Sequence, residues 1–253
     1  MGDISETFGR VCQVCDTLAR RDITTCVECF SKYVRPLEDG CCPNCLDPRH
    51  PAKQRFMYCW TCKNNVDNGH YHLDGVLSCG YYIDKDGDFG FTLHTYKGSG
   101  MKERTWMGFP LAALTYSYLH NHLNCLGEVY GEIDAVVPIP GHAEKLLYFY
   151  DEIPIIRCLN DTRTSGRQSI GGERGFDLKR FQVDASELPT NILLFDDVLT
   201  RGGTAHSAAY ALKMAGVEKL VLFTVGKRLG LTSDLLSVVY EPFSIDRCPL
   251  CSL

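Results

Sequence analysis

The 253-residue sequence predicts an α/β fold, in which a mostly parallel sheet flanked by helices follows a cysteine-rich module. Three observations support this prediction: four CxxC pairs near the N-terminus, short apolar runs that alternate with helical patterns, and a strand pattern that meets a Thr/Gly-rich loop at Ile192–Thr204 (ILLFDDVLTRGGT). We place the cysteine-rich module at residues 1–75 and the α/β domain at 76–253.

Composition narrows the class of protein. Hydrophobic residues make up 45% of the chain, which is enough for a substantial core, and the net charge of −5 argues against binding polyanions over the whole surface. No run approaches the roughly 18 apolar residues of a membrane span, and the first residues lack a basic and then apolar signal region. We therefore expect no membrane association and a cytoplasmic location, where fourteen cysteines favour metal binding over disulfides.

Most cysteines of the N-terminal module fall in CxxC pairs. The four pairs are Cys12/Cys15, Cys26/Cys29, Cys42/Cys45 and Cys59/Cys62. Because a CxxC turn directs two thiolates at one ion, two such turns supply the tetrahedral sulfur set that Zn²⁺ prefers. We expect two Zn²⁺ sites, both structural, since four protein ligands leave no open coordination position.

The spacing leaves the pairing of these turns open. Sequential pairing would join the first two turns in one site and the last two in the other, whereas an interleaved arrangement is also compatible. Cys41 lies beside Cys42 and is an alternative ligand. Three nearby histidines are less favoured substitutes: His50, His70 and His72. A fifth pair, Cys248/Cys251, lies near the C-terminal end, and we expect it to hold no zinc.

The first half of the α/β domain predicts a hairpin and a helix. Val76–Ile83 and Phe89–Tyr96 have strand patterns, and the Asp/Gly-rich segment Asp84–Asp88 between them is typical of a hairpin turn. A helical pattern follows over Met101–Leu123, and Pro110 interrupts or restarts it.

Strands and helices then alternate. Asp134–Pro140 reads as a buried strand, His142–Tyr150 as a short amphipathic helix and Ile153–Leu159 as another strand. The polar, Gly- and Arg-rich segment Asn160–Asp177 has no periodicity, which predicts a loop of functional length.

The C-terminal part contains the most informative segment. The strand that begins at Ile192 ends in Asp196 and Asp197, and a helix is predicted over Thr204–Ala215, followed by a strand over Lys219–Val225. Small and hydroxylated residues between strand and helix allow backbone N–H groups to point at an anion. Carboxylates that can hold sugar hydroxyls, followed by a phosphate-binding loop, suit a ribose 5-phosphate.

The segment ILLFDDVLTRGGT resembles the phosphoribosyl-pyrophosphate (PRPP) signature of type I phosphoribosyltransferases, which implies the fold of that family. In that family the acid pair holds the ribose 2′- and 3′-hydroxyls, and the loop holds the 5′-phosphate. Mg²⁺ accompanies PRPP by bridging substrate oxygens. The pyrophosphate leaves with help from a loop after the first core strand and from a basic hood.

The whole chain resembles the ComF family of phosphoribosyltransferase-like proteins. The resemblance includes the CxxC pairs, a Lys-Tyr-Gly-like loop at Tyr96–Gly98, a "VPVP"-like strand at Val137–Pro140 and an Arg-Gln…Glu-Arg segment between Arg167 and Arg174. The chain departs from the family after the VPVP strand, where His142–Pro154 replaces an Arg-Gly-Phe-Asn-Gln stretch.

The resemblance implies a role for each of the following residues. Catalytic roles fall to Asp196, Asp197 and Arg174, hood positions to Arg163, Arg167 and Arg174, and binding roles to Lys97, Gly141, Thr200, Arg201, Gly202, Gly203 and Thr204.

The expected function is therefore that of a phosphoribosyltransferase-like protein, which binds PRPP with Mg²⁺ and transfers phosphoribose to an unknown nitrogenous acceptor. The alternative is a non-catalytic, ComF-like accessory in DNA uptake or processing, which binds a nucleotide, single-stranded DNA or a helicase-like partner. The basic run Arg49–Arg55, with aromatic residues nearby, motivates this second hypothesis.

Overall fold

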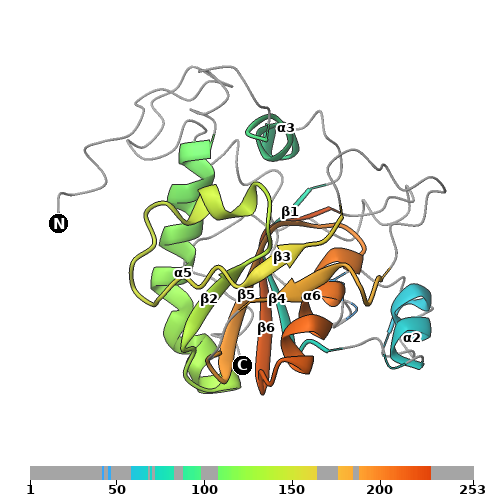
Figure 1. Cartoon of the computed structure of the whole chain (residues 1–253). Coiled ribbons are helices and arrows are strands. Elements are labelled where there is room, and N and C mark those ends of the chain that lie inside the picture. The colour runs from blue at the N-terminus through green and yellow to red at the C-terminus, as the bar shows by residue number, and fades with distance from the viewer. Residues whose placement is uncertain are drawn as a thin grey trace, which may run out of the picture.

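The computed structural model describes residues 42, 45–46, 58–67, 69, 72–82, 88–97, 108–163, 176–184 and 188–228 (Figure 1). Several predictions lie outside these residues. They concern Cys12, Cys15, Cys26, Cys29, Cys41, the run 49–55, Arg167, Arg174, Cys248 and Cys251. Among the described helices, none is long and apolar enough to cross a membrane.

A four-stranded parallel sheet forms the centre of the molecule, in the order β1-β6-β5-β2. Its strands are β1 (Gly75–Tyr82), β2 (Ala135–Pro138), β5 (Asn191–Leu199) and β6 (Lys219–Arg228). The inner strands are apolar almost throughout, as expected for parallel strands that are covered on both faces. The prediction of a mostly parallel sheet is confirmed.

Helices cover both faces of this sheet, with α5 (Gly108–Tyr130) on one side and α6 (Gly203–Met214) on the other (Figure 1). The residues of β5 alternate between the two layers: Leu193 and Phe195 belong to the core that includes α5, whereas Ile192 and Leu194 belong to the core that includes α6. At the end of the strand this alternation shifts, since Val198 packs against the core that includes α5 and Leu199 lies in the core that includes α6.

A helix replaces one of the two strands that the sequence predicted after residue 75. The segment α3 (Asp88–Thr95) is helical, so the prediction of a strand at Phe89–Tyr96 is wrong. The alternation of Phe89, Phe91 and Leu93 mimics a strand. Phe89, Leu93 and Tyr96 also share one helical face, and all three are buried in the core, whereas Phe91 is exposed.

The predicted strand Ile153–Leu159 is also largely absent. Only Ile155 bridges to β2, because Val136 bonds to the carbonyl of Pro154 and the N–H of Ile156. The chain then leaves the sheet and forms a small antiparallel ribbon, β3 (Leu159–Asp161) with β4 (Phe181–Val183). No strand was predicted at the position of β4.

The other predicted elements shift at their boundaries. The helix α5 begins at Gly108 and has Pro110 in its first turn, where the missing N–H costs nothing; residues 101–107 of the predicted helix lie outside the described residues. The predicted helix after β2 is a single 3₁₀ segment, η3 (Ala143–Leu147). The helix α6 agrees with the prediction to within one residue.

The described part of the cysteine-rich module lies beside α6, where the helix α2 (Trp60–Asp67) packs at the edge of the molecule (Figure 1). Leu46 directly follows a cysteine, has a left-handed φ of 59° and is buried in the same core cluster as Leu199 and Ala205. The module therefore shares a hydrophobic core with the α/β part of the chain.

Candidate functional site

A cavity of about 380 Å³ opens at the carboxyl ends of the parallel strands. This is the edge of an open α/β sheet at which ligands bind. Its walls come from the end of α3, the turn after β2, the residue before β4, the loop between β5 and α6, and the end of β6. The lining residues are His94, Lys97, Ile139, Pro140, Gly141, His142, Ala143, Arg180, Asp196, Asp197, Val198, Thr200, Thr204 and Arg228.

The two aspartates at the end of β5 both border this cavity, and each has defined partners. Asp197 lies on the same face of the strand as Phe195, and two groups from the end of α3 contact it: the hydroxyl of Tyr96 donates a hydrogen bond to Oδ2, and Nζ of Lys97 lies 2.7 Å from the same oxygen. The N–H of Asp197 donates to Oδ1 of Asp196 at 2.8 Å. The pair is thus held in a fixed orientation.

Burial and the neighbouring charge of Asp197 raise the pKa of Asp196 to about 7. Two adjacent carboxylates of this kind repel one another, and a divalent cation or hydroxyl donors would relieve the repulsion. The acid pair is therefore suited to bind a diol, a cation or both.

The loop between β5 and α6 turns sharply at Gly202, whose φ is +80°. A Cβ atom there would come within 3.1 Å of the ring of His206, so glycine satisfies both the backbone conformation and the close approach. The first turn of α6 contains no acidic residue. The hydroxyl-bearing residues Thr200 and Thr204 border the cavity on either side of this turn.

A buried lysine supports the loop from below. Lys227 in β6 has no exposed surface, and its Nζ donates to the carbonyl oxygens of Thr200 and Arg228, both at 2.7 Å. A lysine in this position places a positive charge beneath the loop without occupying the cavity. The sequence analysis missed this residue because it ends an apolar strand and has no motif around it.

The turn after β2 forms the opposite wall. Gly141 has a φ of +143°, and a Cβ atom there would meet no neighbouring atom within 4 Å, so the backbone is accessible from the cavity. His142 packs edge-on against Tyr96, and burial together with the charges of Lys145 and Lys97 lowers the pKa of His142. A neutral imidazole therefore lies beside the acid pair.

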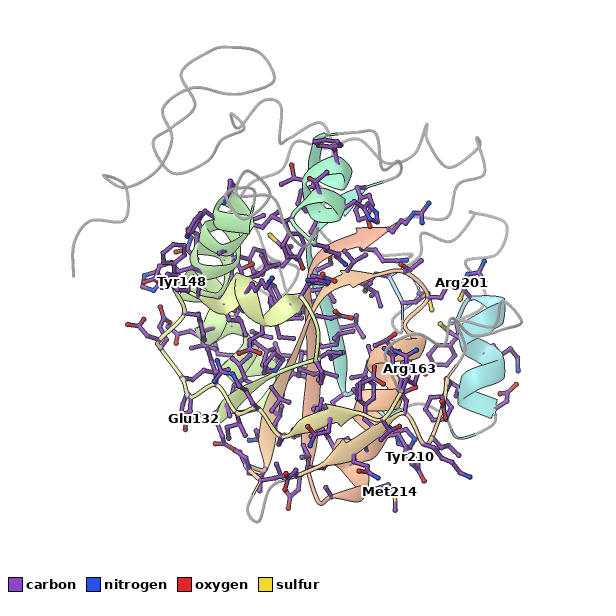
Figure 2. All side chains as sticks on the ribbon, turned by 45° about the horizontal axis from the view of Figure 1, so that its top comes forward. Glu132, Tyr148, Arg163, Arg201, Tyr210 and Met214 are labelled. Atoms are coloured by element: carbon purple, nitrogen blue, oxygen red, sulfur yellow. The ribbon has the colours of Figure 1, made fainter. Side chains whose placement is uncertain are left out.

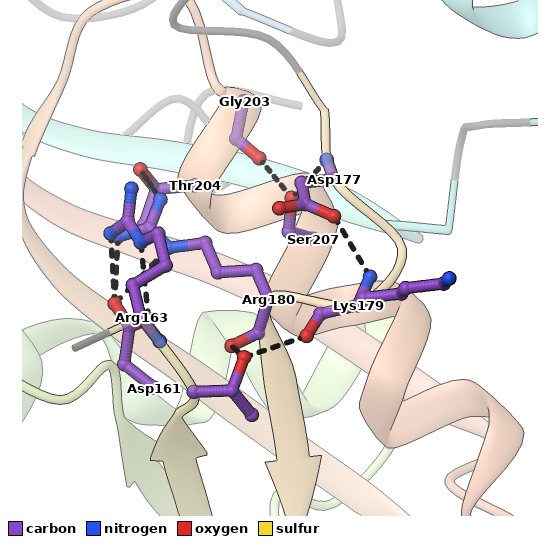
Figure 3. A network of polar contacts seen from close by, with 9 residues as sticks. Asp161, Arg163, Asp177, Lys179, Arg180, Gly203, Thr204 and Ser207 are labelled. Atoms are coloured by element: carbon purple, nitrogen blue, oxygen red, sulfur yellow. Dashed lines mark hydrogen bonds and ion pairs between the residues drawn. The ribbon is translucent and has the colours of Figure 1, made fainter. Parts of the chain in front are cut away.

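The β3–β4 ribbon joins the site through Arg180 (Figure 3). The guanidinium of Arg180 donates to Oγ1 of Thr204 and, from two nitrogens at 3.2 Å each, to Oδ2 of Asp161. Arg163, which was predicted to belong to a basic hood, binds Asp161 instead at 2.8 Å, and its side chain is 51% exposed. Upstream of β4, the N–H of Asp177 donates to Oγ of Ser207 in α6 at 2.9 Å.

Six of the predicted site residues line the cavity: Lys97, Gly141, Asp196, Asp197, Thr200 and Thr204. Gly202 and Gly203 instead form the backbone turn behind it, and Arg201 is exposed (Figure 2). The residues that the sequence analysis missed are Tyr96, Arg180 and Lys227. For Tyr96 a signal existed, since it adjoins Lys97 in the loop that the family resemblance had already selected.

A second candidate site lies in the cysteine-rich module. Cys42, Cys45, Cys59 and Cys62 bring their sulfur atoms within 4.8 Å of one another, so that they could hold a metal ion. Three of the four are fully buried, and the sulfurs of Cys45 and Cys59 are 3.7 Å apart. For these four cysteines the structure agrees with the sequential pairing.

Comparisons with known proteins found no matching family model and no matching curated protein. Among solved structures, the chain is similar to adenine phosphoribosyltransferase from Saccharomyces cerevisiae in complex with D-2,5-dideoxy-2,5-imino-altritol 1,6-bisphosphate and adenine. The identity is 17%, the match covers 47% of this chain and 68% of the yeast chain, and the TM-score is 0.29.

Proposed function

We propose that this protein is a phosphoribosyltransferase-like protein that binds PRPP with Mg²⁺ in the cavity and transfers phosphoribose to a nitrogenous acceptor. One observation carries the proposal: a single cavity gathers the acid pair Asp196 and Asp197, the hydroxyls of Thr200 and Thr204, and Lys97. A diol-binding acid pair within reach of an anion-binding loop matches the two ends of a ribose 5-phosphate.

The proposed roles follow from the chemistry of these groups. Asp196 and Asp197 accept hydrogen bonds from the ribose hydroxyls, and their negative charge favours the positive charge that develops on the ribose ring. The loop binds the 5′-phosphate through backbone N–H groups and threonine hydroxyls. Asp196 and Asp197 are the cavity carboxylates that could hold Mg²⁺ with PRPP, and the cation would supply positive charge against the pyrophosphate.

In the proposed reaction the bond between ribose C1 and the pyrophosphate oxygen breaks, and pyrophosphate leaves with the electron pair. The acceptor nitrogen supplies its lone pair to C1, and the proton it carries passes to the released pyrophosphate or to water. Lys97 and the backbone at Gly141 border the cavity where they would face the leaving group. Arg174, which lies outside the described residues, is proposed to assist from the hood.

For the cysteine cluster we propose structural Zn²⁺. Tetrahedral coordination with Zn–S distances of about 2.3 Å places neighbouring sulfurs ~3.8 Å apart. The separation of 3.7 Å between Cys45 and Cys59 agrees with that geometry. A second zinc in the first four cysteines, and a cytoplasmic location with reduced thiols, remain predictions from the sequence.

Calorimetric titration of PRPP in the presence of Mg²⁺ tests the proposal. We expect binding by the wild-type protein and its loss in the Asp196→Asn/Asp197→Asn double variant, with Asp184→Asn, which changes an exposed aspartate, as the matched control. Unchanged heat in the double variant would remove the assigned site. Pyrophosphate release in a screen of bases and amines separates a transferase from the ComF-like accessory that binds without reacting.

A gel shift with single-stranded DNA at low salt tests that accessory function. The accessory function requires the run Arg49–Arg55 to contact the DNA backbone, so neutralising the basic residues of this run should abolish the shift.

A further inference from the structure

We propose that Arg180 is a ligand of the 5′-phosphate, and that the position it occupies beside Thr204 marks the phosphate subsite of the cavity. The inference rests on the proposed function and names a residue that the family resemblance did not select. Its basis is the position of a largely buried cation at the N-terminal end of α6.

Arg180 spans the gap between two elements that are distant in sequence. It directly precedes β4, and its side chain is only 12% exposed. One end of the guanidinium meets Thr204 in the first turn of α6, and the other meets Asp161 in β3 (Figure 3). The ring of Phe181 lies 4.8 Å beneath it and limits its movement. The guanidinium is therefore fixed at the wall of the cavity.

The charges around Arg180 favour an additional anion. The N-terminal end of a helix carries a partial positive charge, and the first turn of α6 offers no acidic side chain. Lys227 adds a second buried cation under the same loop. Asp161 is shared, since Arg163 binds it at 2.8 Å whereas Arg180 lies 3.2 Å away. The carboxylate of Asp161 is thus divided between two guanidinium groups, and the charge of Asp196 also acts on Arg180.

The hydrogen-bond donors around Arg180 also favour a bound phosphate. A guanidinium can only donate, so Thr204 must accept from Arg180 with its hydroxyl oxygen. The hydroxyl proton of Thr204 is then available to an acceptor in the cavity. Arginine offers a planar set of donors that matches two oxygens of a phosphate. A phosphate at the loop would receive bonds from both side chains.

A purely structural role for Arg180 makes a different prediction. If Arg180 only holds the β3–β4 ribbon against α6, removing Arg180 or removing Asp161 should lower the affinity for phosphate equally. If Arg180 is a phosphate ligand, removing Asp161 frees the guanidinium from a competing carboxylate. Removing Arg180 should then weaken phosphate binding, whereas removing the carboxylate of Asp161 should not.

The experiment is a calorimetric titration of ribose 5-phosphate into the full chain and four variants. Arg180→Met should weaken binding by about 10- to 100-fold, the range expected for one lost hydrogen bond to a charged group. Arg180→Lys should recover part of the loss. Asp161→Asn should bind ribose 5-phosphate as tightly as the wild type or more tightly. Arg163→Met is the control, because Arg163 is exposed and contacts the same carboxylate, and its affinity should stay within about threefold of the wild-type value.

Two results would overturn the inference. Wild-type affinity in Arg180→Met shows that the guanidinium does not contact the phosphate, and equal losses in Arg180→Met and Asp161→Asn assign Arg180 to bracing alone. Both leave the proposed function standing, provided that the wild-type protein binds ribose 5-phosphate and PRPP. A wild-type protein that binds neither removes the proposed function and this inference together.

Discussion

Replacing Asp196 by asparagine should make the protein more stable at neutral pH while it removes ligand binding. Burial and the charge of Asp197 raise the pKa of Asp196 from 3.8 to about 7. Because the folded state holds this proton more tightly than the unfolded state, the stabilising contribution of protonated Asp196 is complete below pH 3.8. It is lost as the pH rises towards 7. Asparagine has no proton to lose and keeps an oxygen that can accept from the N–H of residue 197.

The magnitude follows from the size of the pKa difference. One pKa unit corresponds to about 1.4 kcal/mol, so a shift of this size sets a ceiling of roughly 4 kcal/mol at pH 8. We expect a gain of about 2–4 kcal/mol for Asp196→Asn at pH 8 and almost none at pH 4. At about 2–4 °C for each kcal/mol, the melting temperature should rise by roughly 4–16 °C at the higher pH.

The assay is thermal and urea denaturation of both proteins from pH 4 to pH 8 in buffer without Mg²⁺, since a divalent cation would stabilise the wild-type carboxylates. Asp184→Asn, at an exposed position, should follow the wild-type profile. Addition of PRPP and Mg²⁺ should reverse the order, because only the wild type gains stability by binding. Wild-type and Asp196→Asn profiles that run parallel across this range would refute the reasoning.

Three further predictions concern the supporting residues. Tyr96→Phe removes the hydroxyl that donates to Asp197 and should cost about 1.5–3 kcal/mol in urea denaturation, whereas Tyr148→Phe on the surface should cost nothing; equal stability of the two variants would contradict the first. Cys62→Ser should lower both the metal content, measured by mass spectrometry, and the melting temperature, and an unchanged metal content would exclude the cluster as the site. Lys227→Met leaves two carbonyl oxygens without their buried donor, so we expect a loss of about 1–3 kcal/mol and weaker binding of ribose 5-phosphate; normal affinity would argue against support of the loop by this lysine.

The segment from Ile192 to Ala215 could be predicted because its information is local. The segment contains an apolar run, two acids and a glycine turn, and each restricts the backbone of only a few neighbouring residues. The structure forms β5, the turn and α6 there. The placement of six predicted site residues around one cavity follows from the parallel order of the strands, which brings their carboxyl ends together.

The segment at Phe89 shows where local information failed. Its apolar residues fit a period of two as well as a spacing of three and four, and only contact with the rest of the core decides between them. In the structure Leu93 packs close to Gly226 in β6, where a Cβ atom would lie 2.4 Å from the Cδ1 of Leu93. A glycine more than a hundred residues away thus makes room for this helix.

The individual strand patterns, the strand–loop–helix unit that carries the acid pair, and the CxxC turns could be predicted, since each depends on neighbours along the chain. The pairing of the strands joins distant segments such as β1 and β6. Contacts in the folded chain bring the turns Cys42/Cys45 and Cys59/Cys62 together and make α3 a helix. They also place Tyr96, Arg180 and Lys227 against three successive parts of the strand–loop–helix unit: the end of β5, the first turn of α6 and the loop between them. These features depend on contacts between distant segments, where burial and charge pairing, not periodicity, select the partner.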